Sequence, residues 1–204
     1  DDHSAFDDAQ KVVDGFAELA SIHADLELAN AQYVRLRNDH PRIEWLDSVE
    51  ELPESRTILV ANEFFDALPI KQYVMTDEGV RERRVGFNSE TQVLEFVLGQ
   101  AGLALAKSGT VIPAGTVMEQ SPASRAVMRT LAQHVKAYGG AGLIIDYGYL
   151  GDAHRDTLQA VKAHLFHPVL KDPGSADVTA HVDFTSLMEI ARGAGVMPRG
   201  LATQ

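Results

Sequence analysis

Hydrophobic and polar positions along the chain repeat in periods that predict helices and strands in turn. Apolar residues recur at spacings of three and four over residues 4–19, which is the stripe of a helix with one buried face. Residues 30–37 resume this period, so a short strand that ends near Glu27 is expected between two helices. A last helix is expected over residues 185–194.

Two runs of aliphatic and β-branched residues predict buried strands. The first run covers residues 56–61 and the second residues 141–146, and both have the continuous apolarity of parallel strands covered on both faces. A helix is expected to lead into the second strand, with Ser121 as its N-cap and Pro122 at its first position.

A hairpin is predicted at residues 71–87, because two alternating runs flank the turn-forming sequence Thr76-Asp77-Glu78-Gly79. We expect it to belong to an insertion over about residues 71–118. The alternation of helices and strands predicts an α/β fold, a three-layer sandwich around a mainly parallel sheet. Ligands bind such sheets outside the carboxyl ends of the strands, so polar residues that follow Ala61 and Ile145 are expected to share one rim with Glu27.

Composition narrows the class of protein. The chain has 204 residues, 45% of them hydrophobic, which is enough for one globular domain over residues 1–204. Its 18 Lys and Arg against 29 Asp and Glu give a net charge of −11, which disfavours nucleic acid as a partner. No apolar run approaches the length of a membrane span, and the absence of cysteine excludes thiolate metal sites and cysteine nucleophiles.

Several enzyme signatures are missing from the chain. It has no Walker A loop, no Gly-x-Ser-x-Gly elbow, no His-Glu-x-x-His pair and no Gly-x-Gly-x-x-Gly after a strand. The only close histidine pair, His164 and His167, has no obvious carboxylate partner, so no metal site is expected. The chain begins with Asp1 rather than Met, and we expect an N-terminal portion to be missing from it.

The most informative polar residues follow the first predicted strand. Asn62, Glu63 and Asp66 would reach one rim, where an amide and two carboxylates could bind a flat, cationic substrate or accept its proton. The alternative is a capped strand end, in which these side chains satisfy backbone groups and the neighbouring phenylalanines belong to the core.

Two upstream residues are candidates for a nucleotide-like cofactor. Glu27, at a strand end, could accept both ribose hydroxyls, although an acid in this position is more often plain surface. Trp45 is the only tryptophan and could wall an adenine ring, but a lone tryptophan is more often part of the core.

Ordered motifs reveal a family resemblance. The string Ala-Asn-Glu-Phe-Phe-Asp-Ala-Leu-Pro-Ile at residues 61–70, with Leu-Ile-Ile-Asp-Tyr-Gly at residues 143–148 and Thr-Ala-His-Val-Asp-Phe at residues 179–184, resembles the MidA-like family of class I S-adenosylmethionine-dependent methyltransferases. The resemblance implies a Rossmann-like methyltransferase sandwich with a β-hairpin and helical insertion. The family's N-terminal strand and Gly-rich loop are absent from this chain, and its closing strand would follow Gln204, so the domain is expected to be incomplete at both ends.

The resemblance also implies roles for individual residues. Glu27 would contact the cofactor's ribose, Trp45, Leu46 and Asp47 would border its adenine, and Asn62 would contact both cofactor and acceptor. Asn62, Glu63 and Asp66 would be the catalytic group. The substrate wall would be completed by Asp146, Tyr147, His181 and Asp183.

The activity that the resemblance implies is methyl transfer from S-adenosyl-L-methionine to a protein arginine. In the mitochondrial member of the family the acceptor would belong to a subunit of respiratory complex I, in an assembly role. The expected location is the cytoplasm for a bacterial protein and the mitochondrial matrix for a eukaryotic one. Two alternatives stay open: a non-catalytic interaction or assembly module that uses the hairpin and the acidic surface, and a small-molecule methyltransferase.

Overall fold

The computed structural model describes residues 44–101, 112–151 and 154–203, which fall into two compact units. Among the described residues, the first unit comprises residues 44–45, 76–101 and 159–178, and the second unit comprises residues 46–75, 112–151, 154–158 and 179–203. Both units are therefore assembled from segments that are distant in sequence.

A parallel strand pair is the centre of the second unit. Strand β1 (Thr57–Asn62) pairs with β6 (Gly140–Ile145) in a register that runs from Thr57 opposite Gly140 to Asn62 opposite Ile145. The two strands match the predicted ones to within one residue at each end. Because the register is continuous, both strands end at the same level, and the residues that follow them start from one rim.

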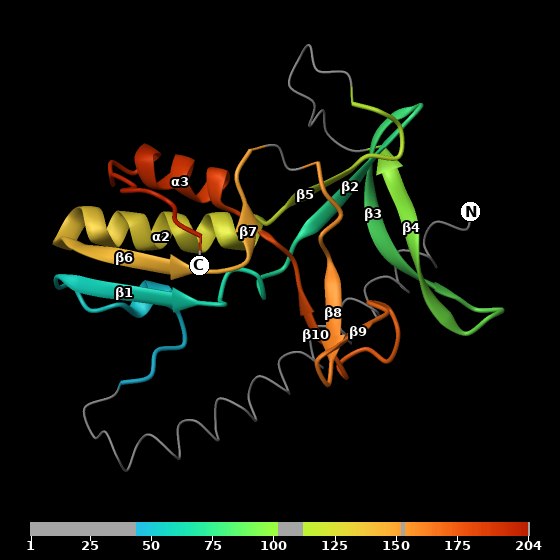
Figure 1. The fold of residues 1–204 in the computed structure, drawn as a ribbon, viewed down its shortest axis with the longest axis horizontal. Helices are drawn as coiled ribbons and strands as arrows, with labels where there is room; N and C mark the ends of the chain where they lie inside the picture. The colour runs from blue at the N-terminus through green and yellow to red at the C-terminus, as the bar shows by residue number, and fades with distance from the viewer. Residues whose placement is uncertain (1–43, 102–111, 152–153, 204) are drawn as a thin grey trace. The chain divides into compact units, whose positions relative to one another are not determined.

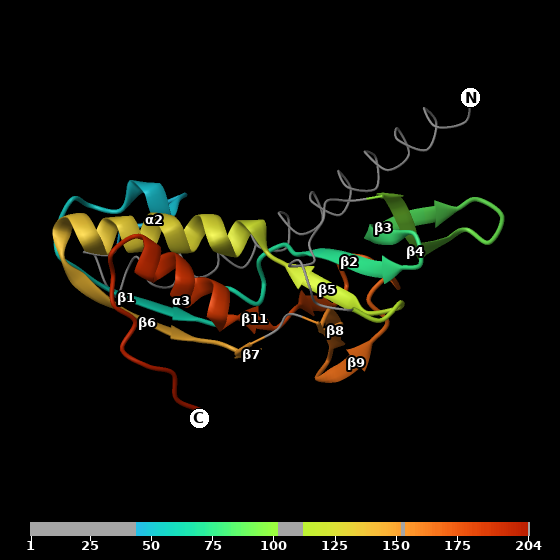
Figure 2. The ribbon, with the colours of Figure 1, turned by 90° about the horizontal axis from the view of Figure 1, so that it is seen from above.

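Helices cover one face of this pair (Figure 1). Helix α2 (Pro122–Tyr138) lies beside α3 (Phe184–Gly193), and the short 3-10 helix η1 (Val49–Glu51) contacts α2 (Figure 2). The core between helices and strands consists of buried Phe65, Val182 and Leu187, against which pack Ala61, Leu68, Val127, Met128, Leu131, Ile144 and Phe184. Burial of this apolar surface is the main stabilising interaction of the unit.

The opposite face of the strand pair differs from the prediction. Ile58 is 83% exposed, and Val60 and Leu143 beside it are exposed as well. Continuous apolarity predicted cover on both faces, yet among the described residues only two layers form. The third layer of the predicted sandwich stays a prediction, because an apolar run shows that a face avoids water but not which segment covers it.

Helix α2 begins as the sequence predicts, and α3 begins one residue before its predicted start, with an N-cap that was not predicted. Ser121 Oγ accepts a hydrogen bond from the Ser124 amide at 3.0 Å, with Pro122 in the first turn of α2. Asp183 Oδ1 accepts from the Ser186 amide at 3.0 Å at the start of α3. Helix α2 ends at Gly139, whose φ of 80° lies in the left-handed region and whose amide donates to Val135.

Two further strand pairs belong to the second unit. Residues Lys71 to Val74 of β2 (Lys71–Thr76) pair antiparallel with β5 (Val117–Gln120), and β7 (Gly148–Tyr149) pairs parallel with β11 (Val182–Asp183). The β5 residue Glu119 is buried, and its carboxylate accepts hydrogen bonds from the Gln72 side chain at 2.7 Å and from the Thr157 and Leu158 amides at 2.9 and 3.2 Å. Glu119 therefore ties the segment before β8 to β2.

The described part of the first unit consists of strands. Strand β3 (Gly79–Asn88) pairs antiparallel with β4 (Val93–Ala101), with a register shift between Arg81 and Arg83. Strand β8 (Gln159–Lys162) pairs with β9 (Leu165–His167) and with β10 (Asp177–Thr179).

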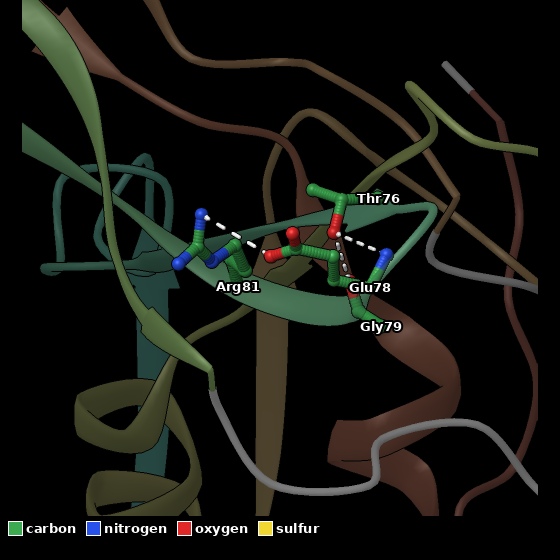
Figure 3. A network of polar contacts seen from close by, with 4 residues as sticks. All are labelled: Thr76, Glu78, Gly79 and Arg81. Atoms are coloured by element: carbon green, nitrogen blue, oxygen red, sulfur yellow. Dashed lines mark hydrogen bonds and ion pairs between the residues drawn. The ribbon is translucent and has the colours of Figure 1, made fainter.

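The turn that leads into β3 is the predicted one (Figure 3). Thr76 Oγ1 donates to the Gly79 carbonyl at 2.7 Å and accepts from the Glu78 amide at 3.3 Å, while Glu78 lies 3.9 Å from the Arg81 guanidinium. The strands and turn of the predicted hairpin are thus confirmed. Strand β4, which follows the hairpin, was not predicted.

Close approach of two strands makes Gly148 sensitive to substitution. A Cβ at this position would lie 2.3 Å from the Val182 carbonyl oxygen and 2.6 Å from the Phe184 ring. We expect Gly148→Ala to lower the free energy of unfolding by about 1–3 kcal/mol, because backbone must move. Gly193→Ala is the control: no atom lies within 4 Å of its added Cβ at the end of α3, so stability should hold or rise by up to ~1 kcal/mol. Equal denaturation midpoints for the two variants would contradict this.

Burial raises the pKa of Tyr149 to about 12, with further contributions from the negative charges of Asp183 and Glu119 and a partial offset from Arg155. Between pH 10 and 12 the unfolded chain loses this proton while the folded chain keeps it, so the free energy of unfolding falls as pH rises. We expect Tyr149→Phe to make this fall shallower, as measured by urea denaturation across that range. An unchanged slope would show that Tyr149 is not responsible.

Candidate functional site

The candidate site lies at the carboxyl end of the parallel pair. Asn62 is the last residue of β1 and is exposed. The next residue, Glu63, donates its amide to the Ile145 carbonyl at 2.9 Å, which continues the pairing one step beyond the strand. Its φ of 46° is left-handed, a conformation that costs a non-glycine residue about 1–2 kcal/mol. Such strain at a strand end is typical of functional positions.

Asp146 connects the two strand ends. One carboxylate oxygen, Oδ2, accepts from the Phe65 amide at 2.9 Å and from the Asp66 amide at 3.3 Å. The other, Oδ1, accepts from the Tyr147 amide at 2.9 Å. All three of these partners are backbone donors, so the side chain that was expected in the substrate wall faces the chain's own loop.

A third segment reaches the same rim from before α3. The Ala180 amide donates to the Asp66 carbonyl at 3.0 Å, and the Val182 amide donates to the Tyr147 carbonyl at 2.8 Å. Residues after β1, after β6 and before α3 are thus joined by backbone hydrogen bonds, as the strand-end argument predicted for the first two.

The predicted catalytic residues differ in their exposure to solvent. Glu63 is exposed, whereas Asp66 is only 8% exposed and its backbone is held at both amide and carbonyl. Tyr147 is 62% exposed and Phe64 is 38% exposed, and Phe64 makes an edge contact with buried Phe65 at 5.2 Å between ring centroids. The accessible part of this rim therefore combines one amide, one carboxylate and two aromatic rings.

The remaining wall residues have structural contacts. His181 is exposed, and its amide donates to Thr157 Oγ1 at 2.9 Å. Asp183 is the N-cap of α3, so one oxygen of its carboxylate is occupied by a backbone amide. Both residues lie in the segment that contacts the rim. The contacts described for them are with the chain itself, so their place in a substrate wall stays a prediction.

The predicted cofactor residues are only partly described. Glu27 lies outside the described residues. Trp45 and Leu46 are both exposed, and the amide of Asp47 is bound by the Glu51 carboxylate at 3.0 Å. Exposed apolar side chains suit the faces of a purine, and the Asn62 amide can both donate and accept, so the chemistry of these residues fits S-adenosyl-L-methionine.

The described residues contain neither a metal-binding cluster nor a membrane-spanning helix. Among them no group of three or more His, Asp or Glu side chains could hold a metal ion. No helix in the part of the chain that the structure describes is long and apolar enough to cross a membrane.

Sequence reasoning missed the role of two acids. Asp146 was expected to line a substrate, but a carboxylate directly after a parallel strand is also well placed to bind neighbouring amides. Glu119 was not singled out, and its only signal in the sequence is an acid that directly follows the apolar residues Val117 and Met118.

Curated relatives resemble this chain over most of its length. It is 38% identical over 143 residues to the mitochondrial protein arginine methyltransferase NDUFAF7 of Xenopus laevis, which covers 69% of this chain and 32% of the relative. It is 37% identical over 172 residues to the Danio rerio protein of the same name, which covers 79% of this chain and 38% of the relative. The chain thus spans about a third of the length of these relatives.

Two solved structures are also similar to this chain. Two crystal structures of Burkholderia thailandensis proteins match with a TM-score of 0.66 and 28% identity over 83% of this chain, and this chain covers 48% and 46% of theirs. One of them is bound to S-adenosyl-homocysteine. At this identity and coverage, the similarity supports a methyltransferase fold.

The family model that matches is described as "Putative S-adenosyl-L-methionine-dependent methyltransferase" and covers residues 4–202. This range includes nearly the whole chain, and the cofactor it names agrees with the bound product in the solved structure. The chain therefore belongs to this family of S-adenosyl-L-methionine-dependent methyltransferases.

Proposed function

We propose that this chain forms part of an enzyme that transfers a methyl group to a protein arginine. One observation carries the proposal: Glu63 is the exposed carboxylate among the three acids of the rim, since Asp66 is buried and Asp146 binds backbone amides. A carboxylate beside aromatic rings suits a guanidinium, which is planar, cationic and able to stack. The names of the curated relatives support arginine as the acceptor.

Methyl transfer requires the protein to position the acceptor nitrogen and the methyl donor more than to activate either of them. When bound, S-adenosyl-L-methionine would supply a methyl group on a sulfonium, which an in-line nitrogen nucleophile could take as the C–S bond breaks and S-adenosyl-homocysteine leaves. Glu63 would orient the guanidinium by hydrogen bonds, and its negative charge would favour loss of the N–H proton as the new N–C bond forms. Phe64 and Tyr147 would exclude water from one side of the acceptor and contact its apolar stem.

The cofactor would be held by residues on both sides of β1. In this proposal Asn62 contacts both the cofactor and the acceptor, Trp45, Leu46 and Asp47 border the adenine, and Glu27 binds the ribose hydroxyls. His181 and Asp183 would complete the substrate wall. The acceptor would be a protein, with a respiratory complex I subunit as the candidate in mitochondrial relatives.

An assembly role is the second candidate, favoured by one feature of the first unit. One face of the β3–β4 pair presents Phe87, Phe96 and Leu98, all of them substantially exposed. The Arg83 guanidinium lies 3.8 Å from the centroid of the Phe96 ring. An exposed apolar face of this kind is a common feature of protein interaction surfaces.

Cofactor binding separates the two candidates. We expect S-adenosyl-homocysteine to bind the full-length natural protein in a calorimetric titration, because the family and a solved neighbour use this cofactor. A parallel titration of residues 1–204 tests whether this chain suffices. Absence of binding by the full-length protein would contradict methyl transfer and favour the assembly role.

Two substitutions of Glu63 distinguish the contribution of its carboxylate to activity from the cost of its left-handed backbone to stability. We expect Glu63→Gln to lower kcat/KM for an arginine-containing peptide by about 10- to 100-fold through loss of the orienting charge. Glu63→Gly should lose the same activity while the free energy of unfolding holds or rises by up to ~1 kcal/mol, since glycine accepts the left-handed φ.

Glu90→Gln is the matched control for Glu63→Gln. Glu90 is exposed in the β3–β4 turn of the first unit, so its neutralisation changes the net charge equally without changing any residue of the rim. Both activity and stability should remain at the wild-type level. A Glu63→Gln enzyme as active as the Glu90→Gln control would rule out an orienting role for Glu63.

A further inference from the structure

We propose that Asp146 is a positioning residue, whose carboxylate fixes the conformation of residues 63–66 and thereby the direction in which Glu63 points. The effect on methyl transfer rests on the proposed function, whereas the positioning itself rests on the geometry of the loop. This role differs from direct contact with substrate, which the family resemblance implied for Asp146.

Hydrogen bonds to backbone amides occupy most of the acceptor positions of the Asp146 carboxylate. A carboxylate has about four acceptor positions. Three of them meet the amides of Phe65, Asp66 and Tyr147, at 2.9, 3.3 and 2.9 Å. The side chain therefore joins the residues after β1 to its own strand end, and it leaves little capacity for a substrate cation.

These bonds act directly beside a strained residue. Glu63 lies two residues before Phe65 and three before Asp66, whose amides Asp146 binds. Its φ of 46° is unfavourable for a residue other than glycine. Its own amide is fixed on the other side by the Ile145 carbonyl at 2.9 Å. With both flanks bonded to residues 145 and 146, the left-handed turn persists and the Cα–Cβ bond of Glu63 keeps one direction.

The chemical identity of the side chain matters because all three partners donate. In Asp146→Asn, one oxygen is replaced by an amide group that can only donate, so at least one backbone amide must face another donor. The remaining oxygen loses its negative charge, so any amide that it still accepts from is bound more weakly. The substitution preserves size and shape. Its effect therefore reports the loss of an acceptor rather than a cavity.

Hydrogen exchange tests the positioning without any assay of activity. We expect Asp146→Asn in the full-length natural protein to speed exchange of the Phe65 and Asp66 amides at least 10-fold, with no change in the amides of α2. Unchanged exchange of both amides would overturn the proposal. If the variant does not fold, the wild-type protein decides: exchange of these two amides as fast as in an unstructured peptide would overturn it.

Thr57→Val is the matched control. Thr57 lies at the opposite end of β1, where its hydroxyl donates to the Ser55 carbonyl at 2.9 Å and lies 3.1 Å from His134 Nε2. The variant removes side-chain hydrogen bonds from the same strand and in the same unit. It should lower stability without speeding exchange at Phe65 or Asp66; equal acceleration by both variants would reduce Asp146 to a general stabilising residue and overturn the proposal.

A double-mutant cycle tests the route through Glu63. With S-adenosyl-L-methionine and a library of arginine-containing peptides, Asp146→Asn should lower kcat by about 10- to 100-fold. In a Glu63→Gln background the same substitution should cost less than threefold, because the carboxylate it positions is already gone. Fully additive losses would overturn the route through Glu63.

The proposed methyl transfer and the positioning role of Asp146 would be contradicted by different results. If the wild-type protein transfers no methyl group while Asp146→Asn still speeds exchange of the two amides, the proposed function fails and the positioning of the loop stands. If methyl transfer is present and exchange is unaffected, the proposed function stands and the positioning role is overturned.

Discussion

The in-register parallel pairing of β1 and β6 is the constraint on which the site depends. It aligns Asn62 with Ile145, so the chain leaves both strands at one level. A shift of one residue would send every side chain of one strand to the other face. It would also separate Asp146 from the amides that it binds. The helices on one face fix this register, since Ala61 and Ile144 both pack against the buried cluster of Phe65, Val182 and Leu187.

Three acids that look equivalent in sequence become different once the strands are paired. Asp66 is buried with its backbone bound on both sides, Asp146 is occupied by amides, and Glu63 remains accessible to solvent. Burial and hydrogen bonding therefore divide a cluster of carboxylates into supporting and accessible members.

Local sequence patterns predicted the individual elements well. The N-cap serine and first-turn proline located α2, the β-branched runs located β1 and β6 to within a residue, and the Asp-Glu-Gly turn located the start of β3. These signals are short-range, because capping, steric restriction of φ and side-chain alternation act over a few residues. Strands β7, β8, β9 and β10 are too short to show a period and were not predicted as such.

The sequence by itself determined that this is an acidic α/β protein of a methyltransferase family with a polar rim after β1, since composition, periodicity and ordered motifs are properties of the linear chain. Tertiary structure alone decided which rim residues are available. Whether Asp146 meets substrate or backbone depends on where residues 65 and 66 lie, some 80 positions away in the chain. Pairing across such a distance is set by burial of the shared core, which no local pattern encodes.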